Sequence, residues 1–261
     1  MFMEEIKYWL TCDIERMSLE SLTGSFVWNI PGNTMRYVFN TSPGFQLFLR
    51  RACQQCLKSK TIILKFIRLS IQQAIELLPL FPNMKIIHVV RDPWAIINSI
   101  RNVLPHGHLE EAATLQPTIF CSRLQNDLSD TKLLMKSHPS IIKLVQYDDI
   151  AKHPLEASKD LYAFGGLQFN DNIVRFVKSQ TQSSLDGCDF FTERRNSTAT
   201  SIEWRSQINL KEAQNIFYYC NKSMSVLGYL DLPDNHTLRD LSIPSRFRYN
   251  ATKILLGDDR F

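Results

Sequence analysis

The residues whose types and spacing best fit a chemical role lie in KIIHVVRDPWAIINSIRN, residues 85–102. Arg91 directly follows an apolar run that predicts a buried strand. Asp92 is a typical helix N-cap and Pro93 suits the first helical position, so a helix is expected to begin there. Ser99 lies about two turns along that helix, at the edge of its apolar face. A planar guanidinium with a nearby hydroxyl suits a phosphate monoester, and the alternative is a capped helix whose arginine forms a surface ion pair.

The elements that must position this segment are strands that alternate with helices. Short apolar runs rich in β-branched residues predict strands, and periodic apolar positions predict helices. The strands are expected at residues 62–67, 86–90 and 141–145, and the helices at residues 68–78, 120–135, 154–164 and 210–227. Near-continuous apolarity in the strands is typical of a parallel sheet covered on both faces. The predicted fold is therefore an open α/β sheet, which binds ligands beyond the carboxyl ends of its strands, where Arg91 lies.

The domain organisation predicted from the sequence is simple. The chain contains no internal repeat, low-complexity tract or Gly/Ser linker, which favours one domain. Residues 105–117 and 181–202 lack a clear period and are expected to form functional loops. The chain becomes polar after Asp231. We therefore expect one domain over residues 1–232 and a peripheral tail over residues 233–261.

Composition excludes several classes of protein. The 261 residues are 44% hydrophobic and 21% charged, as in an ordinary globular protein, and the net charge of +4 is too small and dispersed to indicate a nucleic-acid partner. No stretch approaches the roughly 18–20 apolar residues of a membrane span, and the N-terminus does not resemble a signal peptide. In contrast, six cysteines and five Asn-x-Ser/Thr sequons favour a luminal glycoprotein. An N-terminal anchor absent from this chain would reconcile the two observations.

Cys53 and Cys56 have the spacing of a redox or zinc motif. The pair precedes a predicted strand, whereas a thioredoxin-like pair follows one, and no second pair lies at a suitable distance. We therefore expect no metal site. A disulfide or two buried thiols remain as alternatives, and the pairing cannot be deduced from the sequence.

The pattern Arg-Asp-Pro-x-Ala-x-x-x-Ser after an apolar strand resembles the segment of sulfotransferases that holds the 3′-phosphate of PAPS, the adenosine phosphosulfate donor. Arg91 and Ser99 fall on its two phosphate-binding positions. This chain departs from the pattern at Trp94 and Ile100, where many members have arginine. The resemblance implies a P-loop-NTPase-like open parallel sheet flanked by helices.

Further segments resemble the same family in the same order along the chain: residues 63–70, 121–128, 144–167, 192–205 and 220–229. Gln146 stands where arginine is usual. The resemblance implies that Arg195 and Ser197 close over the nucleotide, and a flexible basic loop is the alternative. The most similar members sulfate the 6-hydroxyl of galactose, N-acetylglucosamine or N-acetylgalactosamine.

The family also has a Gly- and Ser-containing loop between its first strand and first helix. Backbone N–H groups of that loop hold the 5′-phosphosulfate, as in other helix-N-terminal anion sites. Residues 1–60 contain no turn with the required Arg/Lys-x-Gly-Ser/Thr order. We therefore expect this chain to lack the first strand and the phosphosulfate loop, and no catalytic residue is assigned.

The function implied by the resemblance is transfer of a sulfuryl group from PAPS to a sugar hydroxyl of a glycan or glycosaminoglycan, in the Golgi lumen. Membrane attachment would come only from an anchor outside this chain. The alternative is a catalytically inactive sulfotransferase-like protein that binds a nucleotide or glycan. A P-loop phosphotransferase is disfavoured because GxxxxGK[ST] is absent.

Overall fold

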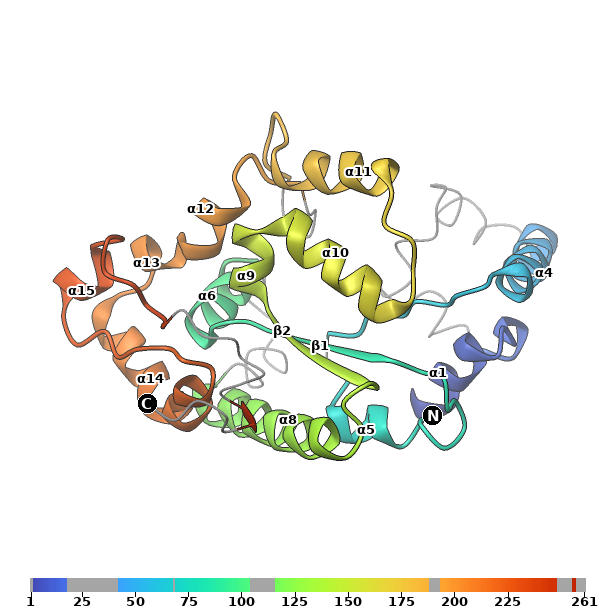
Figure 1. Ribbon diagram of the computed structural model, residues 1–261, viewed down its shortest axis with the longest axis horizontal. Coiled ribbons are helices and arrows are strands. Elements are labelled where there is room, and N and C mark those ends of the chain that lie inside the picture. The colour runs from blue at the N-terminus through green and yellow to red at the C-terminus, as the bar shows by residue number, and fades with distance from the viewer. Residues whose placement is uncertain are drawn as a thin grey trace. The chain divides into compact units, whose positions relative to one another are not determined.

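The predicted parallel sheet is present as two adjacent strands. The computed structural model describes residues 2–17, 42–67, 69–103, 116–187, 193–247 and 255–256. Strand β1 (Ile86–Val90) pairs in parallel with β2 (Ile142–Gln146), and Val90 lies opposite Gln146. Helices connect the two strands, as a parallel pair requires. The described chain is thus a helix-rich α/β fold with a small parallel sheet (Figure 1).

The strand predicted for residues 62–67 is absent, so that prediction is wrong. This segment has no regular secondary structure, and the side chains of Ile63 and Ile67 are 77% and 76% exposed. A β-branched run forms a strand only where another strand pairs with it and other elements cover it. No such strand pairs with residues 62–67 in the described part of the chain.

The helices predicted for residues 120–135, 154–164 and 210–227 are present with small shifts at their ends, and the one predicted for residues 68–78 is shortened to Ile71–Ile75. The helices described after residue 70 are α5 (Ile71–Ile75), α6 (Pro93–Val103), α8 (Pro117–Ser137), α9 (Tyr147–Lys152), α10 (Pro154–Gly165), α11 (Asp171–Thr181), α12 (Ser197–Ile202), α13 (Trp204–Gln207), α14 (Leu210–Val226) and α15 (Asn235–Arg239). Local signals set their ends. Asn209 caps α14, and Gly166 ends α10 at φ +68°, a conformation that glycine adopts without strain.

Helices cover both faces of the two strands. Helix α8 lies on one side and α10 on the other (Figure 1). His88 Nδ1 of β1 is 2.8 Å from Thr131 Oγ1 of α8. On the opposite face, Lys143 of β2 pairs with Asp160 of α10 at 2.8 Å. Alternate side chains of each strand therefore contact opposite layers.

The core between α6, α13 and α14 is built around Trp94. Its ring is fully buried and stacks on Trp204 and Phe217, with centroids 5.0 Å and 6.0 Å away. The indole Nε1 donates to the Ala213 carbonyl at 2.8 Å, so the polar atom of this buried ring is paired. Trp94, one of the departures from the sulfotransferase pattern, therefore packs into the core.

The segment after α14 is packed onto this core. Leu238 is fully buried, and the buried guanidinium of Arg205 donates to the carbonyls of Leu238, Ile243 and Asp240 at 2.8–2.9 Å. Each such charge-assisted bond contributes about 1.5–3 kcal/mol. The described part of residues 233–261 is thus tied to the core. The division into a domain over residues 1–232 and a tail stays a prediction.

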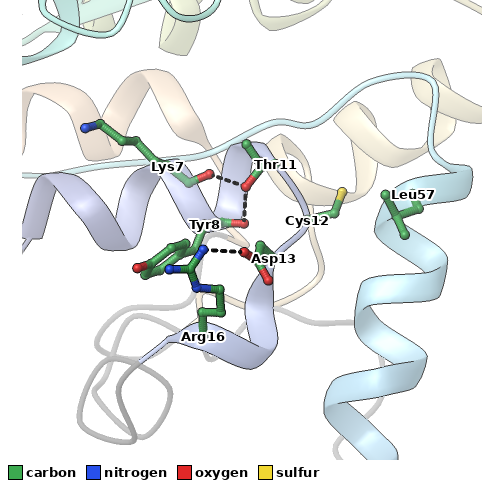
Figure 2. A pocket seen from close by; sticks show the side chains of 7 residues that line it. All are labelled: Lys7, Tyr8, Thr11, Cys12, Asp13, Arg16 and Leu57. Carbon is green, nitrogen blue, oxygen red and sulfur yellow. Dashed lines mark hydrogen bonds and ion pairs between the residues drawn. The ribbon is translucent and has the colours of Figure 1, made fainter.

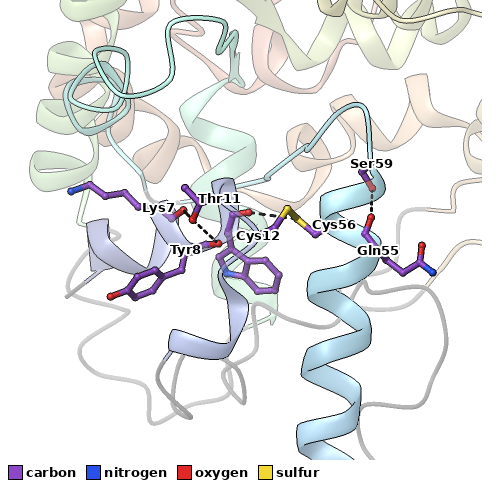
Figure 3. Close-up of a disulfide and its surroundings, with 8 residues drawn as sticks. Lys7, Tyr8, Thr11, Cys12, Gln55, Cys56 and Ser59 are labelled. Carbon is purple, nitrogen blue, oxygen red and sulfur yellow. Dashed lines mark hydrogen bonds between the residues drawn. A yellow bond between two sulfur atoms is a disulfide. The ribbon is translucent and has the colours of Figure 1, made fainter.

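The chain divides between residues 69 and 70 into two compact units. The N-terminal unit contains α1 (Phe2–Leu10), the 3-10 helix η1 (Ile14–Arg16) and α4 (Ser42–Lys58). A disulfide between Cys12 and Cys56 joins the end of α1 to α4 (Figure 3), and Cys53 is a half-buried free thiol. The CxxC pair is therefore not bonded to itself.

A second disulfide lies in the larger unit. Cys121 of α8 and Cys220 of α14 are both buried and joined across the core. Both pairings bridge segments far apart in the sequence, which explains why spacing could not reveal them. Among the residues that the structure covers, no helix has the length and apolar character to cross a bilayer.

Candidate functional site

Arg91 lies at the carboxyl end of β1, where the sequence predicts it. The strand ends at Val90, and the buried Asp92 caps α6 by accepting a hydrogen bond from the Ala95 N–H at 2.5 Å. This buried cap gives the backbone of Arg91 a defined position. The position is at the edge of the sheet where parallel α/β folds bind their ligands.

The guanidinium of Arg91 stacks on an aromatic ring from the neighbouring strand end. Its central carbon is 4.5 Å from the ring centroid of Tyr147, the first residue after β2. Nε of Arg91 is buried and has no hydrogen-bond partner in the described part of the chain. A buried unpaired donor costs about 1–3 kcal/mol. Arg91 therefore fits an anionic oxygen as its missing partner, which is what a phosphate offers.

Two carboxyl groups and a tyrosine form a buried cluster beside Arg91. The Tyr229 hydroxyl donates to Asp148 Oδ2 at 2.7 Å. Burial, and then the charge of Asp148, raises the pKa of Asp92 to about 8, although Arg91 lowers it in part. Burial also raises the pKa of Tyr229 well above its usual value. Asp92 is therefore mostly protonated at neutral pH and leaves the charge of Arg91 available to an anion.

Ser99 lies on the exposed side of α6. Its hydroxyl has no hydrogen-bond partner among the described residues, while Asn98 and Asn102 both donate to Gln207. Six helical steps separate it from Pro93, which is about 9 Å along the axis at about 1.5 Å per step. The structure shows no contact between Ser99 and Arg91, so a bound group must bridge them if both are used.

Arg195 and Ser197 come together in a second place, a cavity of about 230 Å³. Its side chains include two cations and no carboxylate: Ala151, Lys152, Pro154, Thr181, Gln182, Arg195, Asn196, Ser197 and Thr198. Such a lining favours an anionic or polar ligand over an apolar one.

Local bonds hold this cavity. Asp186 accepts from the backbone N–H of Arg195 at 2.9 Å and from its Nε at 2.7 Å. These bonds lower the pKa of Asp186. Ser197 Oγ donates to the Ala151 carbonyl at 2.7 Å, while Asn196 caps α12. These bonds hold Arg195 and Ser197 at the cavity, and their closure over a nucleotide stays a prediction.

Helix α9 links the two groups of predicted residues. Tyr147, which contacts Arg91, begins the helix, and Lys152, which lines the cavity, ends it. Five helical steps of about 1.5 Å separate them by about 7.5 Å along the axis. The two cationic clusters thus lie at opposite ends of one short helix.

A sequence model described as the sulfotransferase family matches residues 41–171, about half of the chain. This chain belongs to the sulfotransferase family. The matched region contains β1, the turn at Arg91, α6, β2 and α9. The family expected from the Arg-Asp-Pro segment is therefore confirmed.

The curated relatives of this sulfotransferase are named carbohydrate sulfotransferases. Carbohydrate sulfotransferase 3 of Mus musculus is 27% identical over 210 residues, covering 74% of this chain and 44% of that protein. Carbohydrate sulfotransferase 5 of Mus musculus is 24% identical, with 74% and 54% covered. Carbohydrate sulfotransferase 1 of Homo sapiens is 25% identical, with 76% and 52% covered. The chain spans about half the length of these relatives.

Three further residues of the candidate site were not predicted from the sequence. Tyr147 stacks on Arg91, Lys152 adds the second cation of the cavity, and Asp186 orients Arg195. Tyr147 and Lys152 lie in the resembling segment 144–167, but neither forms a local motif. Position was a signal for Tyr147. It directly follows β2, and Arg91 directly follows β1, the parallel neighbour of β2, so the two residues lie at the same edge of the sheet.

A larger hollow of about 540 Å³ lies within the N-terminal unit (Figure 2). None of the residues predicted for the site lines it. Both cations in its lining are already paired, Lys7 with Glu4 at 2.5 Å and Arg16 with Asp13 at 3.4 Å, and Arg16 also lies over the ring of Tyr8. It therefore offers less to an anion than Arg91 does. Among the described residues, no three His, Cys, Asp or Glu side chains are grouped to hold a metal.

Proposed function

We propose that this sulfotransferase transfers a sulfuryl group from PAPS to a sugar hydroxyl, at the 6-position of a hexose or N-acetylhexosamine in a glycan or glycosaminoglycan. The observation that carries the proposal is Arg91 at the carboxyl end of a parallel strand: its guanidinium stacks on Tyr147, and its buried Nε has no partner among the residues that the structure describes. The names of the relatives support a carbohydrate acceptor.

In this proposal Arg91 and Ser99 hold the 3′-phosphate of the donor. Arg91 supplies a charge that Asp92 does not cancel, and Ser99 supplies an exposed hydroxyl on α6. Arg195 and Ser197 close over the nucleotide from the other end of α9, and Lys152 adds a second positive charge there. We extend the proposal to a P-loop-like sheet whose first strand and phosphosulfate loop lie outside the residues of this chain.

PAPS supplies the sulfuryl group when it is bound. The residues assigned here act by position and charge, because fixed cations around a transferred anionic group stabilise it without reorganisation. A base must take the proton of the sugar hydroxyl, and no residue of this chain is assigned to that role.

We also propose the Golgi lumen as the compartment, with attachment through a membrane anchor outside this chain. Two disulfides, at Cys12–Cys56 and Cys121–Cys220, support an oxidising compartment. The sequons at Asn221 and Asn235 are exposed and open to glycosylation. Asn196 is a poor acceptor because its side chain caps α12 within the cavity lining.

The test is calorimetric binding of adenosine 3′,5′-bisphosphate, the desulfated donor, to the 261-residue chain. Arg91→Ala should weaken binding at least about 100-fold, because it removes two charge-assisted bonds of about 1.5–3 kcal/mol each. Arg101→Ala is the matched control, since Arg101 lies on the exposed side of α6 and pairs with Glu212. A folded wild-type chain that does not bind, or equal affinity in Arg91→Ala, contradicts the proposal.

A second measurement addresses the reaction. The full-length protein is incubated with PAPS and an oligosaccharide containing galactose or N-acetylglucosamine, and the sulfated position is read by NMR. Sulfate at the 6-position supports the proposal. Nucleotide binding without transfer to any sugar acceptor supports the inactive binding protein instead.

A further inference from the structure

Arg246 reaches the strand end beside the nucleotide site from a distant part of the chain. Its side chain is only 11% exposed. The guanidinium donates to Gln146 Oε1 and to the carboxylate of Asp149, the more distant carboxylate oxygen being 3.4 Å away. A buried guanidinium with two specific acceptors marks a defined joint between segments.

The backbone around Arg246 is fixed as well. Tyr229 and Arg246 form an antiparallel bridge, Leu230 donates to the Ser245 carbonyl at 2.9 Å, and Phe247 donates to the Gly228 carbonyl at 2.9 Å. The segment that carries Arg246 is therefore held against the end of α14. The backbone position of Arg246, and the direction from which its side chain approaches β2, are therefore fixed.

The two acceptors of Arg246 flank Tyr147. Gln146 is the last residue of β2, and Asp149 lies in the first turn of α9. The amide of Gln146 is also bound at its other end, where Nε2 donates to the Leu227 carbonyl at 2.8 Å. The bonds therefore fix the backbone on both sides of Tyr147, which itself is only half-buried.

We propose that Arg246 is a positioning residue of the nucleotide site: it clamps the junction of β2 and α9 and thereby holds the Tyr147 ring against the guanidinium of Arg91. This inference rests on the proposed function. It places a residue of the segment after α14 in direct support of a site formed by β1 and α9. In this proposal Arg246 does not touch the nucleotide. It acts through Tyr147, which holds Arg91, and Arg91 binds the phosphate.

The experiment is a double-mutant cycle measured by calorimetry with adenosine 3′,5′-bisphosphate on the full 261-residue chain. Arg246→Gln should weaken binding about tenfold, the size expected for a lost guanidinium–aromatic contact in a desolvated site. Arg246→Lys keeps the charge and one bond, and should recover part of the affinity. In the Tyr147→Leu background, Arg246→Gln should have little further effect, because both act through the same ring.

Arg239→Gln is the matched control. Arg239 belongs to the same C-terminal segment and donates to backbone carbonyls of Arg205 and Ile208, but not to β2 or α9. It should lower the melting temperature while leaving nucleotide affinity unchanged. Hydrogen exchange provides a readout without ligand: Arg246→Gln should speed exchange of the α9 amides, and Arg239→Gln should not.

The outcomes separate the two proposals. If the folded wild-type chain does not bind the nucleotide, the proposed function fails and this inference fails with it. If the wild type binds and Arg246→Gln binds equally well, only this inference is overturned. Additive losses in Arg246→Gln and Tyr147→Leu overturn it too, since they assign Arg246 a purely structural role.

Discussion

Arg91 and Arg195 are both expected at the nucleotide, yet their surroundings differ. Arg91 lies half-buried over Tyr147, beside a buried cluster of Asp92, Asp148 and Tyr229. The side chain of Arg195 is 66% exposed and is held by one carboxylate, that of Asp186. Interactions in the first setting are weakly screened by water and salt, and those in the second are strongly screened.

The difference assigns the two ends of α9 different tasks. The buried end keeps in a fixed place a donor that no described residue pairs, so its geometry is set before a ligand arrives. The cavity end offers charges that are adjustable and individually weak. We therefore expect the Arg91 end to supply most of the affinity and the Arg195 end to supply closure over the nucleotide.

The largest expected effect concerns the buried cluster and pH. The pKa of Asp92 is about 8 in the folded protein against 3.8 normally, so the stability from its protonated form is present below pH 4 and lost as pH rises toward 8. The slope reaches at most about 1.4 kcal/mol per pH unit. Asp92→Asn keeps the cap and should remove this slope. Urea unfolding at pH 5, 6, 7 and 8 measures it.

The effect of Asp92 on this slope can be separated from that of other titrating groups. Burial lowers the pKa of His88 to about 4, so His88 adds stability above pH 6.5 that is lost as pH falls toward 4, equally in both proteins. Asp231→Asn, at an exposed position, serves as the control. Identical pH profiles for wild type and Asp92→Asn would show that Asp92 is not protonated in the folded protein. They would contradict the contrast drawn between the Arg91 and Arg195 ends of α9.

The next effect concerns the ring beneath Arg91. Tyr147→Leu should weaken binding of adenosine 3′,5′-bisphosphate about tenfold, because a desolvated guanidinium–ring contact contributes about 1–2 kcal/mol. Tyr147→Phe keeps the ring and should bind like the wild type. Calorimetry on both variants decides the matter. Equal affinities for the leucine and phenylalanine variants contradict a role for the ring.

The smallest effect concerns the exposed cavity. Lys152→Gln should weaken nucleotide binding only about two- to fivefold at low salt, and the loss should vanish at about 1 M salt, where the Debye length is about 3 Å. Lys159→Gln is the matched control, an exposed lysine on α10 outside the cavity lining. A loss larger than that of Tyr147→Leu, or one that persists at high salt, would reverse the ranking of the two ends.

Much of the fold near the site was predictable from local patterns. The strand at residues 86–90 has the expected bounds, the one at 141–145 is shifted by one residue, and the long helices begin and end close to their predicted residues. These segments carry strong periodic or capping signals. The segment 62–67 has the same composition as a strand but lacks a pairing partner in the described structure, so composition alone misassigned it.

The candidate site, too, was predictable only in part. Arg91 could be placed because a strand, a cap and a helix start meet at consecutive residues. The partners of Arg91 and Arg195 could not be placed, since Tyr147 and Asp186 are ordinary residues that matter only through contacts. The expected loop at residues 105–117 falls mostly outside the described residues and stays a prediction.

The sequence by itself determined the sulfotransferase family, the strand–cap–helix unit at residues 86–103 and the position of Arg91, because each rests on side chains adjacent in the chain. Only the tertiary structure decided that Tyr147 lies against Arg91, that Cys121 bonds to Cys220 and that Arg246 reaches Gln146. These contacts join segments from about 50 to 100 residues apart, and such pairings form only when packing of the whole domain brings the segments together.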